Sequence, residues 1–280
     1  MTVLLNRQYL LAVGGKGIAS SRPDAEGFHP TLRIAFNVVR SLTKETNNSE
    51  IAVFNLNEES RKSLDAKPTV PVVLSAGYGT ELSRIFSGDV SYVASQRQGV
   101  DWVTKLSLQD GANKYRSARI NLSLGPGTTI GAALQRAASA IGVPVGNLST
   151  HLTNARGGLE TFSRGIVLSG SAQGQLDKLL KTAGYGWSIQ DGQLQVLAPK
   201  ETTDGFAVKL SPTTGLIGSP ERGDKGITKA KALIQPGLLP GNKVVLESAV
   251  VNGAFRIEKS TFKGDSHDTD WYVEFEGKPV

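Results

Sequence analysis

The chain has 280 residues and carries 31 Lys and Arg against 25 Asp and Glu, which gives a formal net charge of +6 at neutral pH. It has no cysteine, and this excludes a disulfide scaffold, thiolate catalysis and a zinc site with cysteine ligands. Its three histidines are far apart and no apolar run is long enough to cross a bilayer, so we expect no histidine metal site, no signal peptide and no membrane insertion.

The first 112 residues are predicted to form an antiparallel β barrel or sandwich that carries one short helix. Residues 31–41 alternate in part between apolar and polar side chains, and a polar tract separates them from the apolar run 51–54, a pattern typical of a hairpin. Asn57 is placed to cap a short helix whose first turn contains Glu58 and Glu59. Further strands are expected at residues 70–74, 82–93 and 100–108.

Residues 113–200 are predicted to form a small α+β domain. A turn at 125–127 precedes a helix that starts at Thr128 or Thr129 and ends at Gly142. A second helix is expected after Ser171. Asp191-Gly192 lies between two alternating segments, 186–189 and 193–197, and predicts a hairpin with a type I′ turn.

Residues 201–280 return to β character after a polar linker and are predicted to form a second β domain, with strands at 230–234, 243–248, 254–262 and 270–275. This domain repeats, in the same order, motifs of the first one. The motifs are Val72-Val73-Leu74, Arg84-Ile85-Phe86, Gly88-Asp89 and Asp101-Trp102-Val103 in the first, and Val244-Val245-Leu246, Phe255-Arg256-Ile257, Gly264-Asp265 and Asp270-Trp271-Tyr272-Val273 in the second. One interpretation is an internal duplication; the other is that two unrelated antiparallel domains share common strand motifs. If the duplication is real, a ring of such chains contains twice as many β modules as subunits.

Motifs of enzyme chemistry are scarce, and we predict no catalytic, cofactor-binding or metal-binding residues. The glycines at 125, 127 and 131 have the wrong spacing for a dinucleotide fingerprint, and no acidic residue occurs between Asp110 and Glu160 to bind a ribose. A turn followed by a helix start accounts for them. The adjacent carboxylates Glu58/Glu59 and Asp268/Asp270 are explained by a helix start and a strand end, although a glycosidase pair could also assemble from distant positions.

Basic residues and tryptophans each allow two interpretations. Residues 111–159 contain no acid and could face nucleic acid or an acidic partner, or their basic side chains could be spread over different faces. The basic residues are Lys114, Arg116, Arg119, Arg136 and Arg156. Trp102, Trp187 and Trp271 lie in strand contexts, which favours anchors in a core or a subunit interface over sugar-stacking platforms.

Several motifs together resemble the baseplate hub proteins of tailed bacteriophages. Residues 51–64 read IAVFNLNEESRKSL, and Ala76-Gly77-Tyr78 and Ile85-Phe86-Ser87-Gly88-Asp89-Val90 follow them. In the second half, Pro236-Gly237-Leu238-Leu239-Pro240-Gly241 precedes Val244-Val245-Leu246. The resemblance covers most of the chain and is weakest over residues 1–30 and 145–165.

The resemblance implies a mainly β fold in which two antiparallel, tail-tube-like barrel or sandwich domains, 1–112 and 201–280, flank the α+β insert 113–200. It also implies a homotrimer with a pseudo-sixfold ring, which joins the hexameric tail-tube ring to the trimeric central spike beside other baseplate proteins. The tape-measure protein and then DNA pass through its channel. Such a protein belongs to the tail baseplate of the virion and is assembled in the cytoplasm of the host bacterium.

Two other functions are kept as alternatives. The chain is too short to hold an added lysozyme domain, so we predict that it is not an enzyme and uses no cofactor. The competing hypothesis is a β-rich, phage-associated enzyme that degrades peptidoglycan or polysaccharide. A nucleic-acid-binding module that uses Arg116, Arg119 and Arg136 is the third.

Overall fold

The computed structural model describes residues 6–22, 29–30, 32–43, 47–65, 70–109, 118–142, 144, 146, 161–182, 184–203 and 207–280. Contacts between residues divide the chain into two units. The first, here the β unit, combines residues 1–41, 47–110 and 204–280, and the second, the α+β unit, combines 42–46 and 111–203. The bounds predicted for three domains remain a prediction.

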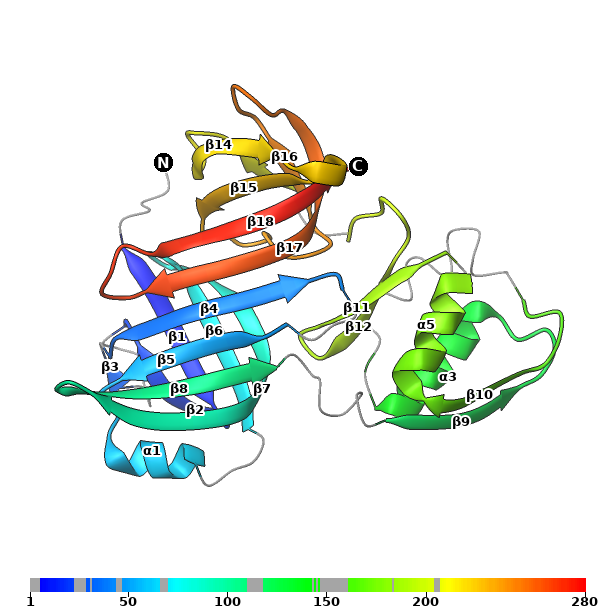
Figure 1. Cartoon of the computed structure of the whole chain (residues 1–280), viewed down its shortest axis with the longest axis horizontal. Helices are drawn as coiled ribbons and strands as arrows, with labels where there is room; N and C mark the ends of the chain where they lie inside the picture. The colour runs from blue at the N-terminus through cyan, green and yellow to red at the C-terminus, as the bar shows by residue number, and fades with distance from the viewer. Residues whose placement is uncertain are drawn as a thin grey trace. The chain divides into compact units, whose positions relative to one another are not determined.

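In its described residues, the β unit contains fourteen strands and the short helix α1 (Figure 1). Its N-terminal part comprises β1 (Arg7–Val13), β2 (Lys16–Ser20), β3 (His29–Pro30), β4 (Ile34–Ser41), β5 (Ser49–Phe54), α1 (Glu58–Asp65), β6 (Val70–Tyr78), β7 (Glu81–Gln98) and β8 (Asp101–Gln109). Its C-terminal part comprises β13 (Val208–Leu210), β14 (Leu216–Arg222), the 3-10 turn η1 (Asp224–Gly226), β15 (Thr228–Leu233), β16 (Lys243–Leu246), β17 (Gly253–Asp265) and β18 (Trp271–Pro279). The predicted mainly β fold is confirmed, and each strand expected in these segments overlaps an observed one.

The two β segments form one sheet. Its strand order is β14-β15-β18-β17-β4-β5-β8-β7-β6-β1-β2-β3, and β13 and β16 branch from it beside β17. The link between the segments is the antiparallel pairing of β4 with β17, from Ser41 opposite Lys259 to Ala35 opposite Asp265. The described strands therefore form no closed barrel, and the two predicted β domains share a ladder of backbone hydrogen bonds.

The strand order repeats within the sheet, which supports the internal duplication. Neighbouring strands follow the order β4-β5-β8-β7-β6 in the first segment and β14-β15-β18-β17-β16 in the second, and every neighbouring pair is antiparallel. We call these two sets module 1 and module 2. Two parts of the motif alignment were wrong. Phe86 lies opposite Leu74, whereas Gly253 and not Ile257 lies opposite Leu246, so Arg84-Ile85-Phe86 and Phe255-Arg256-Ile257 are not equivalent. Asp89 pairs with Gln109 far from the hairpin turn, whereas Asp265 lies at the turn itself. The two Gly-Asp pairs are therefore not equivalent positions.

The longest strands act as corners that fold the sheet over its own core. The first half of β7 pairs with β6 and its second half with β8, and a bulge between Val90 and Tyr92 separates the two halves. β17 pairs with β16 and then with β4, and it has a bulge between Ile257 and Lys259. Bulges of this kind bend a strand and let it take part in two packed layers. The enclosed core contains side chains from β1 and from both modules, among them Leu11, Ile34, Ile51, Leu74, Leu106, Phe262 and Trp271.

The α+β unit follows the predicted order of elements. Its described elements are β9 (Arg119–Leu124), α3 (Ile130–Ile141), β10 (Ile166–Ser171), α5 (Ala172–Thr182), β11 (Gly186–Gln190) and β12 (Gln193–Leu197), and they enclose their own apolar core. Asp191 and Gly192 both have positive φ, at 52° and 74°, as the predicted turn requires. Neither α3 nor α5, nor α1 of the β unit, is long and apolar enough to cross a bilayer.

The three tryptophans differ in burial. Trp187 and Trp271 are buried, the second with only 2% of its surface exposed, whereas Trp102 is 40% exposed. Trp187 and Trp271 are therefore core anchors, and for the half-exposed Trp102 an anchor in a subunit interface remains a prediction. The guanidinium carbon of Arg61 lies over the ring of Trp102, 3.9 Å from the ring centroid.

We expect Trp271→Ala to lower the free energy of unfolding by about 3–5 kcal/mol, because it empties a large, closed volume of the core. Trp102→Ala should lower the free energy of unfolding by only about 1 kcal/mol, because it removes one exposed cation–π contact and a ring that is only partly buried. Urea denaturation of both variants measures the difference. Equal losses would show that the two hairpins are packed alike.

Candidate assembly surface

The residues considered for chemistry at the sequence level have structural roles. Residues 125–127 form a turn, and the side-chain oxygen of Thr129 accepts a hydrogen bond from the amide of Ala132 at the start of α3. Glu58 lies in the exposed first turn of α1 and pairs with Lys62 at 2.7 Å. In the described part of the chain, no three His, Asp or Glu side chains gather as a metal site would need.

The basic residues of the α+β unit are only partly within the described structure. Arg119 at the start of β9 and Arg136 on α3 are both exposed. Lys114, Arg116 and Arg156 lie outside the described residues, so the basic interface predicted from them remains a prediction.

The junction of the two modules is built around Trp271. Its indole Nε1 donates to the carbonyl of Gly77 at 3.3 Å, and its own carbonyl accepts from the Tyr78 hydroxyl at 3.2 Å. Burial raises the pKa of Tyr78 to about 12, so the hydroxyl keeps its proton and donates throughout the physiological range. The ring of Phe36 meets the indole edge-on, with centroids 5.2 Å apart. Gly264 lies opposite Trp271, and any Cβ there would overlap the ring of Phe36.

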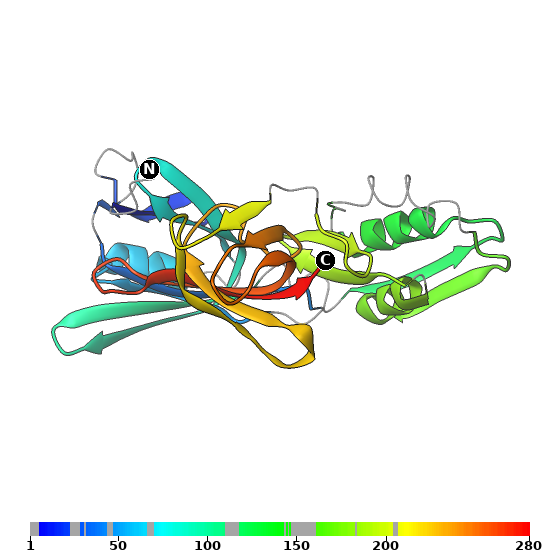
Figure 2. The same cartoon turned by 90° about the horizontal axis from the view of Figure 1, so that it is seen from above.

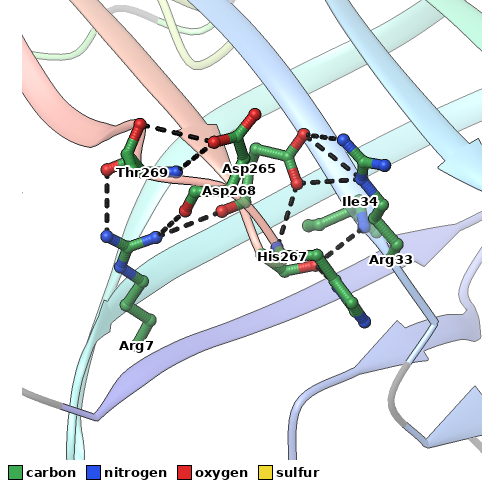
Figure 3. A network of polar contacts seen from close by, with 8 residues as sticks. Arg7, Arg33, Ile34, Asp265, His267, Asp268 and Thr269 are labelled. Atoms are coloured by element: carbon green, nitrogen blue, oxygen red, sulfur yellow. Dashed lines mark hydrogen bonds and ion pairs between the residues drawn. The ribbon is translucent and has the colours of Figure 1, made fainter.

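Two arginines, Arg7 on β1 and Arg33 just before β4, bind the turn between β17 and β18 (Figure 3). Arg7 on β1 donates to the main-chain carbonyls of Asp268 and Thr269, the second at 2.9 Å. Arg33, just before β4, binds the carboxylate of Asp265 through two nitrogens, with Nη2 2.7 Å from Oδ2 and Nε 3.1 Å from Oδ1. Sequence reasoning did not identify either arginine, because their partners are more than 230 positions away.

Asp265 is the charged centre of this network. Its partial burial alone would raise the pKa of the carboxyl, but hydrogen bonds from Arg33 and from the His267 amide outweigh burial and hold the pKa below its ordinary value. The same hydrogen bond raises the pKa of Arg33. The pair is therefore ionised at neutral pH, and it fixes the turn against module 1.

The sheet has a second notable feature, a polar face on the side opposite the core. It extends over β15, β18, β17, β4, β5 and β8, which lie side by side in Figure 1. Its side chains are half-buried or exposed and include Glu50, Lys105, Lys229, Lys263, Glu274 and Glu276. Opposite charges pair across neighbouring strands, Lys263 with Glu274 at 3.0 Å, Lys105 with Glu50 at 3.4 Å and Lys229 with Glu276 at 3.7 Å.

Two hollows occur on this polar face, one over β14, β15, β18 and β17 and one over β17, β4 and β5. Both are lined mainly by lysine, glutamate, aspartate and small side chains. Binding sites for small molecules are usually lined by apolar and aromatic groups with a few polar ones. The polar face thus has the character of a wide, hydrated surface in which charges compensate one another.

Comparison with known proteins relates the chain to phage tail proteins. A family model described as baseplate hub gp41 matches residues 20–277. No curated protein sequence matches the chain.

Three solved structures share the fold. A tail protein of prophage MuSo2 from Shewanella oneidensis is 10% identical with a TM-score of 0.66, covering 98% of this chain and 97% of that one. A tail protein from Neisseria meningitidis MC58 is 11% identical with a TM-score of 0.62, covering 98% and 96%. The E. coli c3393 protein is 11% identical with a TM-score of 0.59, covering 96% and 76%; it is a type VI secretion component with structural similarity to the T4 phage tail proteins gp27 and gp5.

We expect Asp265→Asn to lower the free energy of unfolding by about 1 kcal/mol at pH 7, because the charge-assisted part of the bond to a half-exposed Arg33 is lost. The folded-state pKa of Asp265 is depressed, so its contribution is present above the ordinary value of 3.8 and is lost as pH falls through the folded-state pKa. Denaturation of both proteins at pH 7 and pH 3 tests this. A difference between them that does not shrink at pH 3 would contradict it.

Proposed function

This chain belongs to the baseplate hub gp41 family, and we propose that it serves as a trimeric adaptor between the hexameric tail tube and the trimeric central spike. Membership gives it a structural role in the phage baseplate and a place in the tail of the virion. The adaptor role, the trimer and the partners are the proposal.

The repeated strand order is the observation that carries the proposal. One chain contains two modules of the same topology, so three chains supply six modules. A ring of this kind offers approximate sixfold symmetry to one neighbour and threefold symmetry to the other, with no second protein needed to resolve the mismatch. A single module per chain would not provide this.

The polar face supports a channel role. We propose that it lines the passage for the tape-measure protein and then DNA. A duplex carries one negative charge for about every 1.7 Å of its axis and is held tightly by uncompensated lysines. Here the lysines face glutamates on neighbouring strands, which leaves little net positive potential to retain a polyanion.

A cell-wall hydrolase is the alternative function. It would need two carboxylates placed at a defined separation beside a substrate cleft. Glu274 and Glu276 on the polar face pair with lysines. Phe275 and Phe36, the aromatic side chains that line the two hollows, are buried and so offer no platform for a sugar ring. We therefore propose no enzymatic activity.

Purified protein is expected to sediment as a trimer at high concentration and to form rings with six lobes in negative-stain electron micrographs. The physical reason is that two modules per chain divide a sixfold ring among three subunits. The same preparation should give no clearing on a cell-wall zymogram. A chain that stays monomeric at millimolar concentration and is absent from tail particles would contradict the adaptor role. Clearing on the zymogram would favour the hydrolase.

A second prediction concerns the polar face. Changing Glu50, Glu274 and Glu276 to glutamine leaves their lysine partners uncompensated, so the variant should elute from a DNA column at a clearly higher salt concentration than the unchanged protein. A matched variant, Glu59→Gln with Asp65→Asn and Glu81→Gln, makes the same change in net charge at exposed positions elsewhere. Equal elution of the two variants would mean that only net charge matters and that the face has no special role.

A further inference from the structure

The contact between the two modules inside one chain has an unused counterpart on the surface. Within the chain, module 1 offers its edge strand β4 and module 2 offers the second half of its long strand β17. In the repeated strand order, β14 corresponds to β4 and β7 corresponds to β17. The matching contact would therefore join β14 of one copy to the second half of β7 of another.

The register of the two long strands makes the correspondence exact to the residue. In β7, Phe86 lies opposite Leu74 and Arg97 lies opposite Trp102. In β17, Gly253 lies opposite Leu246 and Gly264 lies opposite Trp271. Phe86 and Arg97 are eleven residues apart along β7, and Gly253 and Gly264 are eleven residues apart along β17. The bulges also coincide, since each begins four residues after the first of these positions, at Val90 and at Ile257.

With this register, each part of the internal junction that module 2 contributes has an equivalent position in module 1. Residues 259–265 of β17, which pair with β4, correspond to residues 92–98 of β7. Trp271, which is buried in the internal junction, corresponds to Trp102. The end of the adjacent strand agrees, because Phe54 at the end of β5 faces Val103 and Leu233 at the end of β15 faces Tyr272.

The hairpin of β7 and β8 is uncovered where the hairpin of β17 and β18 is covered. Residues 92–98 pair with β8 on one side, and among the described strands none pairs with them on the other. Tyr92, Val100 and Trp102 on this hairpin are 66%, 87% and 40% exposed. The hairpin extends beyond the rest of the sheet in Figure 2. An extended strand edge beside exposed apolar side chains is a typical surface for strand addition.

The complementary edge lies on β14, which ends the described sheet. Ile217 on this strand is 37% exposed and corresponds to Ala35, because they face the equivalent residues Lys231 and Ala52. Pro220 has no amide hydrogen and interrupts the donors of this edge, which protects it against indiscriminate addition of strands. A strand that pairs with β14 must therefore form hydrogen bonds only beside Pro220 and must also pack against Ile217.

We propose that residues 92–98 of β7 in one copy pair with β14 of a second copy, and that Val100 and Trp102 pack against that copy. The partner is thus a second molecule of the same chain, and the contact between copies repeats the contact between modules. The two surfaces are different and lie on different modules, so the contact is head-to-tail; such a contact closes into a ring when the rotation between successive copies adds up to a full turn, as the proposed trimer requires. This inference rests on the proposed trimeric adaptor and identifies its interface.

The absence of native cysteines allows a direct test with the full chain. Ala35 and Asp265 are Cα partners across the internal junction, and their counterparts are Ile217 and Gln98. The double variant Gln98→Cys with Ile217→Cys should form intermolecular disulfides under mild oxidation, with a covalent trimer as the main product on a non-reducing gel. The matched control is Gln98→Cys with Val250→Cys, since Val250 is also exposed but lies in the loop between β16 and β17.

The outcomes separate this inference from the proposed function. If the unoxidised protein sediments as a trimer but the Gln98/Ile217 pair cross-links no better than the control pair, the interface is wrong and the trimer stands. If the protein is monomeric at every concentration and does not cross-link, both are overturned.

A second variant tests the contact without new chemistry. Val100 is almost fully exposed in the single chain, so Val100→Glu should leave the thermal midpoint of the monomer unchanged while raising the concentration needed for half-assembly at least tenfold. Val250→Glu makes the same substitution outside the interface and should assemble as the unchanged protein does. Equal assembly of the two variants would overturn the role of the hairpin.

Discussion

The pairing of β4 with β17 is the constraint on which the rest of the β unit depends. It joins strands more than 200 residues apart, and the buried Trp271 and the bonds from Arg7 and Arg33 fix it at one end. Without it the two modules would be separate sheets, each with an exposed edge beside its hydrophobic core. With it, their polar side chains align as one surface and their apolar side chains fill one core.

The polar face follows from that pairing and from the alternation of side chains along a strand. Once Phe36 and Phe262 point into the core, their neighbours Asn37 and Lys263 must point to the other face, where they lie opposite one another. Each ion pair on such an exposed surface adds little stability. Their more important effect is electrostatic, because alternating lysines and glutamates give a hydrated surface with a weak net field, which is the property that the channel role proposed above requires.

Local features of the fold could be predicted from the sequence, whereas the junction could not. Helix caps, the Asp191-Gly192 turn and the alternating strands depend on neighbours within a few residues, and the structure contains them all. The pairing of β4 with β17 depends on which distant edges are free. Trp102 and Trp271 have nearly the same local sequence and occupy equivalent strand positions, yet one is half-exposed and the other buried, because only the second hairpin finds its partner within the chain. The Gly-Asp and the Phe-Ile motifs occur in both modules but not at equivalent positions, because equivalence depends on the register between strands, which the residue types alone do not determine.

A chain made of two like modules joined head to tail necessarily ends with one unused surface of each kind. In a single molecule these are the outer side of β7 and the edge of β14, and both expose backbone groups and apolar side chains at some risk of aggregation. Covering them with an unrelated element would remove the risk but would also end the repeat. Joining them between copies, as proposed above, would remove the risk and continue the same contact, and a closed ring would have no free end. A single chain has two open edges for as long as this proposed contact is not made, and the bulge and Pro220 in β14 limit which strands can pair there.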